Sequence, residues 1–238
     1  MVLPLVAFAD PEDFAPLDTA IANVEQFDWM ILTSAQAVWA LRKRSEAIKR
    51  PLKLTSGKLR IAYVGPVTAE AGRRAGLPVD HVAQTHNGVA LAEELGDRLQ
   101  GCTVVLPRSD RANPDLPEAL KHHGARVTEV IAYRTLRPTD VEQRSLREVA
   151  EGKADAILFF SPSAVQHFVE LFGAEQSCVL QDQLAITAVG PVTGKALREA
   201  GIQRTVMAAD TTASAVIEAL EKHFAGMMKH APAGAKRG

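Results

Sequence analysis

A fifteen-residue segment occurs twice in this chain, once in each half. The copies at residues 63–77 and 188–202 share nine identical positions in register, among them the pentapeptide Val-Gly-Pro-Val-Thr. In both copies an apolar run of strand length comes before the pentapeptide and a helical pattern comes after it. A chain that repeats one strand-turn-helix unit in this way is best explained by two similar domains.

The similarity extends beyond these two segments. Residues 28–38 match residues 155–165, and residues 86–95 run parallel to residues 211–220. Apolar runs of strand length alternate with helical patterns along most of the chain, joined by short Gly, Pro, Ser or Thr turns. This alternation is typical of parallel sheets with helices on both faces, so we predict an α/β fold.

The two halves differ in what precedes them. Residues 102–138 add a strand, a helix and a strand that complete the first domain. Residues 4–10 resemble residues 130–135, which follow a strand and a helix. A strand and helix of about thirty residues are therefore expected before residues 4–10, and this chain does not contain them. We therefore expect one domain to lack its first unit. A late start of the reading frame, a trimmed chain and a variant that pairs with another copy all fit this pattern.

Composition narrows the class of protein. With 47% hydrophobic and 23% charged residues, the chain has the composition of an ordinary globular protein. No stretch approaches the ~18 apolar residues of a membrane helix, and the N-terminus lacks the features of a signal peptide, so we expect a cytoplasmic protein. A net charge of -1 gives no electrostatic signature of nucleic acid binding. Dinucleotide, P-loop, zinc and paired-cysteine motifs are absent from the sequence.

The two repeated turns are candidate ligand sites. Loops that lead from a parallel strand into a helix present free backbone amides and a partial positive charge. Each turn adds a glycine that lets a ligand approach the backbone and a threonine near the helix start: Gly65 and Thr68, then Gly190 and Thr193. The alternative is that the threonines only cap their own helices. Retention of the whole pentapeptide favours the ligand site.

Hydroxyl side chains follow the preceding strand of each half. Thr33 and Ser34 end one strand, Ser161 and Ser163 end its counterpart, and all four stand where a helix is predicted to begin. Each is compatible with a simple helix cap. Taken together, they suggest two rims of hydroxyls and amides facing a cleft between the domains, where ligands commonly bind.

Tyr133 is one of only two tyrosines and lies where the chain crosses from one predicted domain to the other. A half-buried structural tyrosine and a tyrosine that acts in the cleft are equally compatible with this position. The basic residues Arg108, Arg111 and Lys195 stand near turns and could meet carboxylates, although isolated basic residues are more often solvated.

Five segments are distributed over most of the chain: "ILTSAQAV", "YVGPVTAEAGRRAGL", "LPEALKHHGARVTEVIAYRT", "ILFFSPSAVQHF" and "AVGPVTGKALREAGI". Together they resemble the uroporphyrinogen-III synthase family. No single segment is specific, but their order and duplication are.

The resemblance implies two flavodoxin-like parallel-sheet domains joined by a two-stranded linker. Residues 1–11 and 129–139 would then be linker strands, residues 12–128 the continuous domain, and residues 140–224 the incomplete second domain. The last residues, 225–238, would form a flexible tail. A monomer is implied, or a dimer if another copy compensates for the missing unit.

The resemblance also implies an activity in heme biosynthesis. The family converts hydroxymethylbilane, a linear tetrapyrrole rich in carboxylates, to uroporphyrinogen III with inversion of the last pyrrole ring and loss of water, without a cofactor or metal. By motif match Tyr133 would assist departure of the hydroxyl, and the substrate would contact Thr33, Ser34, Gly65, Thr68, Ser161, Ser163, Gly190 and Thr193. The small-molecule substrate is the only partner implied, with no nucleic acid and no membrane. The alternative is a non-catalytic ligand-binding or regulatory module derived from this synthase.

Overall fold

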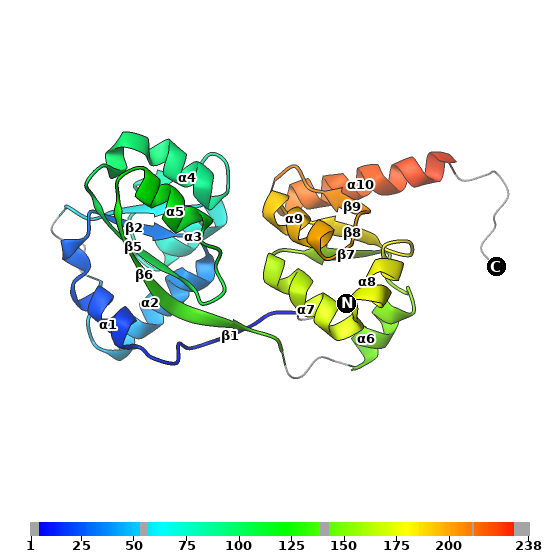
Figure 1. Cartoon of the computed structure of the whole chain (residues 1–238), viewed down its shortest axis with the longest axis horizontal. Helices are drawn as coiled ribbons and strands as arrows, with labels where there is room; N and C mark the ends of the chain where they lie inside the picture. Colours follow the sequence, from blue (N-terminus) through cyan, green and yellow to red (C-terminus); the bar gives the residue numbers. More distant parts are fainter. Residues whose placement is uncertain (1–4, 53–56, 139–142, 211, 231–238) are drawn as a thin grey trace. The chain divides into compact units, whose positions relative to one another are not determined.

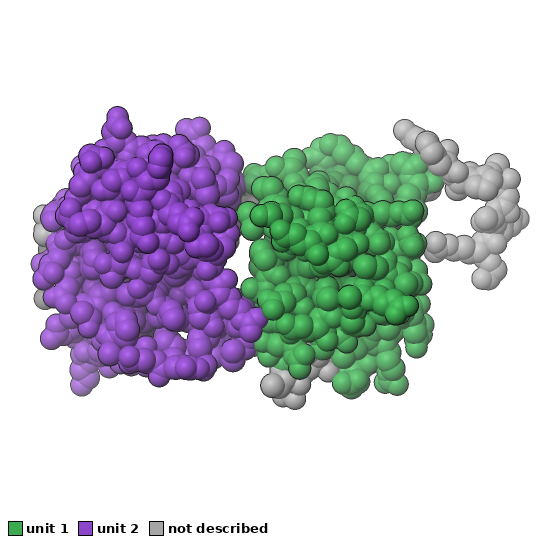
Figure 2. Space-filling model, in the orientation of Figure 1, with its two compact units in different colours: residues 1–7, 137–238 green, residues 8–136 purple. Residues whose placement is uncertain are grey.

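A computed structural model describes residues 5–52, 57–138, 143–210 and 212–230 of the chain. The chain forms two compact units, one of residues 8–136 and one of residues 1–7 together with residues 137–238 (Figure 2). The larger unit is therefore continuous in sequence. The smaller unit draws on both ends of the chain.

The larger unit is built on a sheet with strand order β1-β6-β5-β2-β3-β4. Each neighbouring pair from β6 to β4 is parallel. The strands are β1 (Ala7–Ala9), β2 (Trp29–Leu32), β3 (Arg60–Tyr63), β4 (His81–Val82), β5 (Thr103–Ser109) and β6 (Arg126–Leu136).

Helices cover both faces of this sheet (Figure 1). Along β2, Met30 and Leu32 pack with α1, α2 and α3, whereas Trp29 and Ile31 pack with α4 and α5. This alternation follows from the two-residue period of a strand, which turns successive side chains to opposite faces. The helices are α1 (Ala15–Ala22), α2 (Ala35–Ala47), α3 (Pro66–Arg74), α4 (Gly88–Leu95) and α5 (Asp115–His122), with short 3-10 helices η1 (Val24–Gln26) and η2 (Gly96–Leu99).

The smaller unit repeats part of this design with a parallel sheet of order β7-β8-β9. Its strands are β7 (Ala156–Phe159), β8 (Ala185–Ala188) and β9 (Thr205–Met207), and its helices are α6 (Gln143–Ala150), α7 (Pro162–Phe172), α8 (Ala174–Leu180), α9 (Pro191–Glu199) and α10 (Ala213–His230). Leu5 joins its apolar core beside Phe159 and Phe168. The buried His167 ring also contacts the Leu5 carbonyl, with an Nδ1–O distance of 2.6 Å.

The α/β class predicted from the sequence agrees with the structure. The expected tail from residue 225 is wrong as far as His230, because α10 continues to that residue. Gly226 alone does not end a helix, and the next proline is Pro232. Residues 231–238 lie outside the described residues.

The larger unit extends beyond the expected range of residues 12–128. Its sheet includes Tyr133 and its neighbours because β6 keeps pairing with β5 as far as Ser109 and Tyr133. From β2 the chain moves to one side through β3 and β4, and later to the other side through β5 and β6. The carboxyl ends of β2 and β5 thus flank a switch point, the place where open α/β sheets bind ligands.

Candidate active site

A β-bulge sets the orientation of Tyr133 at this switch point. Pairing between β5 and β6 is regular up to Arg108 and Ile131, and then shifts so that Ser109 pairs with Tyr133. The extra residue, Ala132, changes the phase of the alternation, so Ala132 and Tyr133 are both buried although they are consecutive. Bulges commonly redirect side chains beside active sites. Here the bulge turns the phenol inward.

The Tyr133 hydroxyl shares a hydrogen bond of 3.1 Å with Ser34 Oγ. Ser34 is the N-cap of α2, and its Oγ also accepts from the Ala37 N–H at 3.1 Å. Burial raises the pKa of Tyr133 above its ordinary value and nearby Asp110 adds to the rise, while the Ser34 hydrogen bond and Arg108 oppose it. The phenol therefore keeps its proton at neutral pH.

Residues around Tyr133 hold the end of β6 in place. Ser109 Oγ and Thr135 Oγ1 are 2.7 Å apart and hydrogen-bonded. Asp110 Oδ1 accepts from the Thr135 N–H at 2.9 Å, and the Asp110 N–H donates to the Tyr133 carbonyl at 3.3 Å. These contacts fix the backbone of β6 at Tyr133 and just after it.

Arg108 serves the structure of this region. Its guanidinium is buried, donates to Glu129 Oε2 at 2.9 Å and also donates to the Asn113 carbonyl. Lys195 is exposed and lies 3.8 Å from Glu199 one helical turn away. Each of these two basic residues thus already faces a carboxylate of the chain itself.

Both repeated turns connect a strand to a helix at the carboxyl edge of a sheet. The N-caps are Gly65 in α3 and Gly190 in α9, so no side chain caps either helix. Thr68 and Thr193 are the third helical residues and are buried. The interpretation of these threonines as plain N-caps is therefore wrong. Backbone amides without a side-chain cap are available to an anionic ligand.

The second valine of each turn is exposed in the structure. Val67 is 66% exposed and Val192 is 46% exposed, although both begin helices that bury other residues. The remaining predicted hydroxyls occupy helix starts in their own units. Ser161 caps α7 and accepts from the Ala164 N–H at 3.3 Å, and Ser163 is the second residue of that helix.

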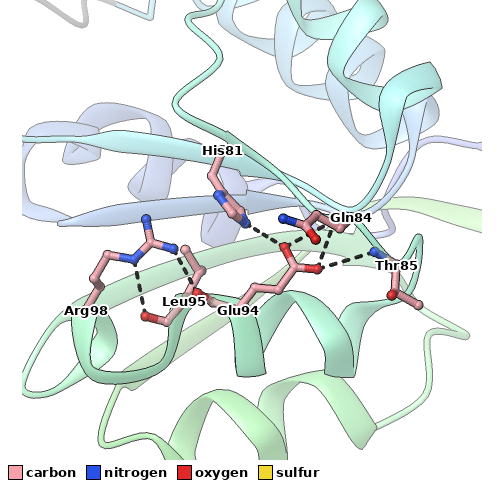
Figure 3. A network of polar contacts seen from close by, with 6 residues as sticks. All are labelled: His81, Gln84, Thr85, Glu94, Leu95 and Arg98. Carbon is pink, nitrogen blue, oxygen red and sulfur yellow. Dashed lines mark hydrogen bonds and ion pairs between the residues drawn. The ribbon is translucent and has the colours of Figure 1, made fainter.

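A carboxylate network anchors the loop beside the first turn (Figure 3). Glu94 on α4 lies 3.0 Å from His81 Nε2 and accepts from the N–H groups of Gln84 at 2.9 Å and Thr85 at 3.3 Å. Burial alone would raise the pKa of Glu94, but these two N–H groups and the His81 ring outweigh it, and the pKa lies below its ordinary value. His86, which follows Thr85 in the anchored loop, packs against the backbone of the first turn at Gly65.

His81 is partly buried and pairs with a carboxylate. The side chain lies in β4, and its partner Glu94 is thirteen residues away. The sheet brings β4 beside α4, so the pair depends on the fold and not on a local sequence spacing. Among the described residues, no group of three His, Cys, Asp or Glu side chains could hold a metal ion, and no helix has the length and apolar character to cross a membrane.

Comparisons with known proteins identify the family. The family model described as "Uroporphyrinogen-III synthase HemD" matches residues 1–218. The chain belongs to the uroporphyrinogen-III synthase family. The uroporphyrinogen-III synthase of Synechococcus elongatus is 28% identical over 92% of this chain and 84% of its own length. The chloroplastic uroporphyrinogen-III synthase of Oryza sativa is 28% identical over 97% of this chain and 75% of its own length.

Solved structures of uroporphyrinogen III synthase share the fold. A mutant from Thermus thermophilus covers 97% of this chain and 90% of its own, with a TM-score of 0.68 and 22% identity. The protein from Helicobacter pylori covers 92% and 91%, with a TM-score of 0.63 and 18% identity. At these identities the likeness supports the α/β fold itself.

This member of the uroporphyrinogen-III synthase family also has a pocket that the sequence analysis did not anticipate. A cavity of about 390 Å³ adjoins Tyr133 and is lined by Phe8, Ala9, Asp10, Gln36, Trp39, Ala40 and Lys43. Four of these residues recur at three- and four-residue steps along α2. The sequence signal for this pocket was Trp39, one of only two tryptophans, at a spacing that places it on one face of α2 with Gln36 and Lys43.

Proposed function

We propose that this chain catalyses the cyclisation of hydroxymethylbilane to uroporphyrinogen III, with inversion of the last pyrrole ring and loss of water. The reaction is that of a carbon-oxygen lyase. The observation that carries the proposal is the Tyr133–Ser34 hydrogen bond at the sheet's switch point, in a chain of this family.

Tyr133 is proposed to assist the departure of the hydroxyl group. The carbon-oxygen bond breaks with its electron pair on oxygen, and the phenol supplies the proton that converts this oxygen to water. Electrons of the attached pyrrole stabilise the carbon left behind. The substituted carbon of the last ring attacks it and forms a spiro intermediate. The bond from that ring carbon to its old bridge carbon then breaks, and the bridge carbon bonds to the unsubstituted carbon of the same ring, which inverts the ring. The proton lost when the pyrroles regain aromaticity restores the phenol. Ser34 holds the phenol oxygen in place throughout.

Binding of the substrate is proposed to rely on helix starts and hydroxyls. The chain has a net charge of -1, so its overall field does not attract a carboxylate-rich substrate. Placed donors do this locally, at the uncapped helices after Gly65 and Gly190. The proposed contacts remain Thr33, Ser34, Gly65, Thr68, Ser161, Ser163, Gly190 and Thr193. Because a free bilane can close in more than one way, the main task is to hold one folded conformation.

Both units are proposed to be flavodoxin-like. If β5 and β6 are numbered 1 and 2, and β2, β3 and β4 are numbered 3, 4 and 5, the strand order from β6 to β4 reads 2-1-3-4-5. This is the flavodoxin order. The smaller unit has counterparts of β2, β3 and β4, and its described residues include no counterpart of β5 beside β7. This difference supports the proposal of an incomplete second domain. The neighbouring strands β1 and β6, where the chain passes between units, are the proposed linkers.

The decisive experiment adds hydroxymethylbilane to the purified chain and determines the isomer ratio of the oxidised product by chromatography. Predominantly type III product is the expected result. Only type I product, which forms without enzyme, would contradict the proposal and favour the non-catalytic module. A chain that binds the bilane without turning it over would support that module further.

A further inference from the structure

The pocket beside Tyr133 has the features of a binding site for a flat ring. Its volume of about 390 Å³ is in the range of small-molecule sites, roughly 300–1,000 Å³. Every lining residue belongs to the larger unit, so the pocket is complete within residues 8–136.

Two aromatic side chains of the pocket are unusually exposed. Phe8 is 52% exposed and Trp39 is 38% exposed, although the chain has few aromatic residues. Phe8 meets the Tyr133 ring edge-on, with ring centroids 5.4 Å apart. Exposed aromatic surface gathered around one cavity marks a binding surface more often than single exposed apolar residues do.

The charged groups of the pocket compensate each other. Lys43 Nζ lies 2.8 Å and 2.9 Å from the two carboxylate oxygens of Asp10. The backbone of Asp10 is held in addition by Arg134, whose Nε donates to the Asp10 carbonyl at 3.0 Å. The pocket therefore offers aromatic walls, one carboxylate acceptor and one ammonium, without net charge. A simple anion gains little there, whereas a ring with an N–H edge fits both kinds of group.

The side chains of Gln36, Trp39 and Lys43 on α2 are not required by the fold. Gln36, Trp39 and Lys43 project from the face of α2 opposite to Ala37, Val38 and Leu41, which pack in the core. At the corresponding places on the repeated helix α7 stand Ser163, Gln166 and Glu170. The shared scaffold thus accepts polar side chains at these positions. The aromatic wall belongs to the larger unit alone.

We propose that this pocket binds the pyrrole ring of the substrate that carries the departing hydroxyl. The ring face lies against Trp39 and Phe8, its N–H donates to Asp10, and Lys43 meets a carboxylate side chain of the same ring. This inference rests on the proposed function for the identity of the ring. Tyr133 lines the same cavity, so a ring held there places its hydroxymethyl substituent beside the phenol.

Trp39 gives a direct probe of this pocket. The only other tryptophan, Trp29, is 3% exposed in β2 and serves as an internal reference. Porphobilinogen, a monopyrrole with two carboxylate side chains, is expected to quench the Trp39 emission in a saturable way. In Trp39→Phe the remaining emission of Trp29 should not respond. Glutarate, a dicarboxylate without a ring, should have no effect.

Kinetics supply the second test. Trp39→Ala should raise KM for hydroxymethylbilane about tenfold, because aromatic stacking of a flat base is worth about 1–3 kcal/mol. The kcat should change little, and Trp39→Phe should restore most of the affinity. Val179→Ala, an exposed apolar position on α8, is the control for nonspecific effects. Thermal unfolding of each variant shows whether it is folded.

The outcomes separate this inference from the proposed function. Type III product with an unchanged KM in Trp39→Ala and no quenching would overturn the pocket and leave the function standing. Absence of type III product would overturn the function, and porphobilinogen quenching would still decide whether the pocket binds a pyrrole. Equal quenching by glutarate would show an anion site and overturn the inference.

Discussion

The two Val-Gly-Pro-Val-Thr turns have the same residues and different backbones. Gly65 is extended, with φ of -174°, a conformation that any residue adopts. Gly190 has φ of +92° and ψ of 162°, a region that is essentially confined to glycine. The fold therefore requires glycine in the second turn and does not require it in the first. Under the proposed function, close approach of the substrate to the backbone of the first turn would account for the glycine there.

The residues that surround the two turns also differ. The first turn is packed against His86, in a loop that Glu94 anchors, and shares its sheet edge with Ser34 and Tyr133. In the smaller unit, the neighbouring helix start is Ser161, preceded by the exposed Phe160. The proposed proton donor therefore lies in the larger unit, although both units offer helix starts without a side-chain cap.

The largest expected effect concerns the two tyrosines. Tyr133→Phe should lower kcat by about a hundredfold, because it removes the proposed proton donor and leaves the ring in place. Tyr63→Phe is the matched control, since Tyr63 is buried in β3 and donates to the Pro78 carbonyl at 3.0 Å. Burial raises the pKa of Tyr63 to about 12, so it is also a neutral phenol. Its loss should reduce stability by about 1 kcal/mol without reducing kcat.

Measured kcat values and urea unfolding of the two variants check this prediction. An equal loss of kcat in both would mean that Tyr133 acts through the fold. A Tyr133→Phe variant with the turnover of the parent would remove the catalytic assignment.

Substitution of the two turn glycines tests the comparison itself. Gly190→Ala should destabilise the chain by about 1–3 kcal/mol, because alanine is strained at this positive φ. Gly65→Ala should cost less, because a Cβ there meets the nearest atom of His86 at 3.4 Å, an ordinary contact distance. Its effect should appear as a raised KM. Urea unfolding and steady-state kinetics distinguish the two, and equal loss of stability in both variants would contradict the comparison.

The smallest effect concerns the loop beside the first turn. Glu94→Gln should destabilise the chain by about 1 kcal/mol at neutral pH, because the two backbone donors lose a charged acceptor. The folded pKa of Glu94 is lowered, so this stabilisation is full above the ordinary value of 4.5 and disappears as the pH falls through the folded pKa. Unfolding of parent and variant should therefore converge in acid.

Glu93→Gln provides the neighbouring control. This carboxylate is more exposed and lies 3.4 Å from His123, so its loss should change stability little at any pH. A difference between parent and Glu94→Gln that persists unchanged at low pH would show that the Glu94 contacts do not depend on its charge.

The sequence was sufficient to predict those features that depend on local pattern. Apolar runs and turn residues placed the strands, and Ser34 and Ser161 were expected at helix starts, where they are found. The bulge at Ala132 could not be predicted, because it is a property of the register between β5 and β6. The pair of His81 and Glu94 likewise depends on elements that meet only in the folded chain.

The N-cap residues show a second limit of prediction from the sequence. A threonine near a helix start is a favourable cap by composition, yet the chain enters each helix at a glycine followed by proline, three positions earlier. This shift of the helix start changes the role of Thr68 from cap to buried side chain. Element types were therefore easier to predict than their first residues.

The unequal way in which the two units draw on the chain has a consequence for synthesis on the ribosome. The larger unit is one continuous stretch, so it can fold once residue 136 has emerged. The smaller unit has to wait longer, because Leu5 contacts His167 across 162 positions and Leu5 belongs to the core of that unit. The apolar segment around Leu5 is thus made before the larger unit and buried after it. We therefore expect the larger unit to fold before the smaller one during synthesis.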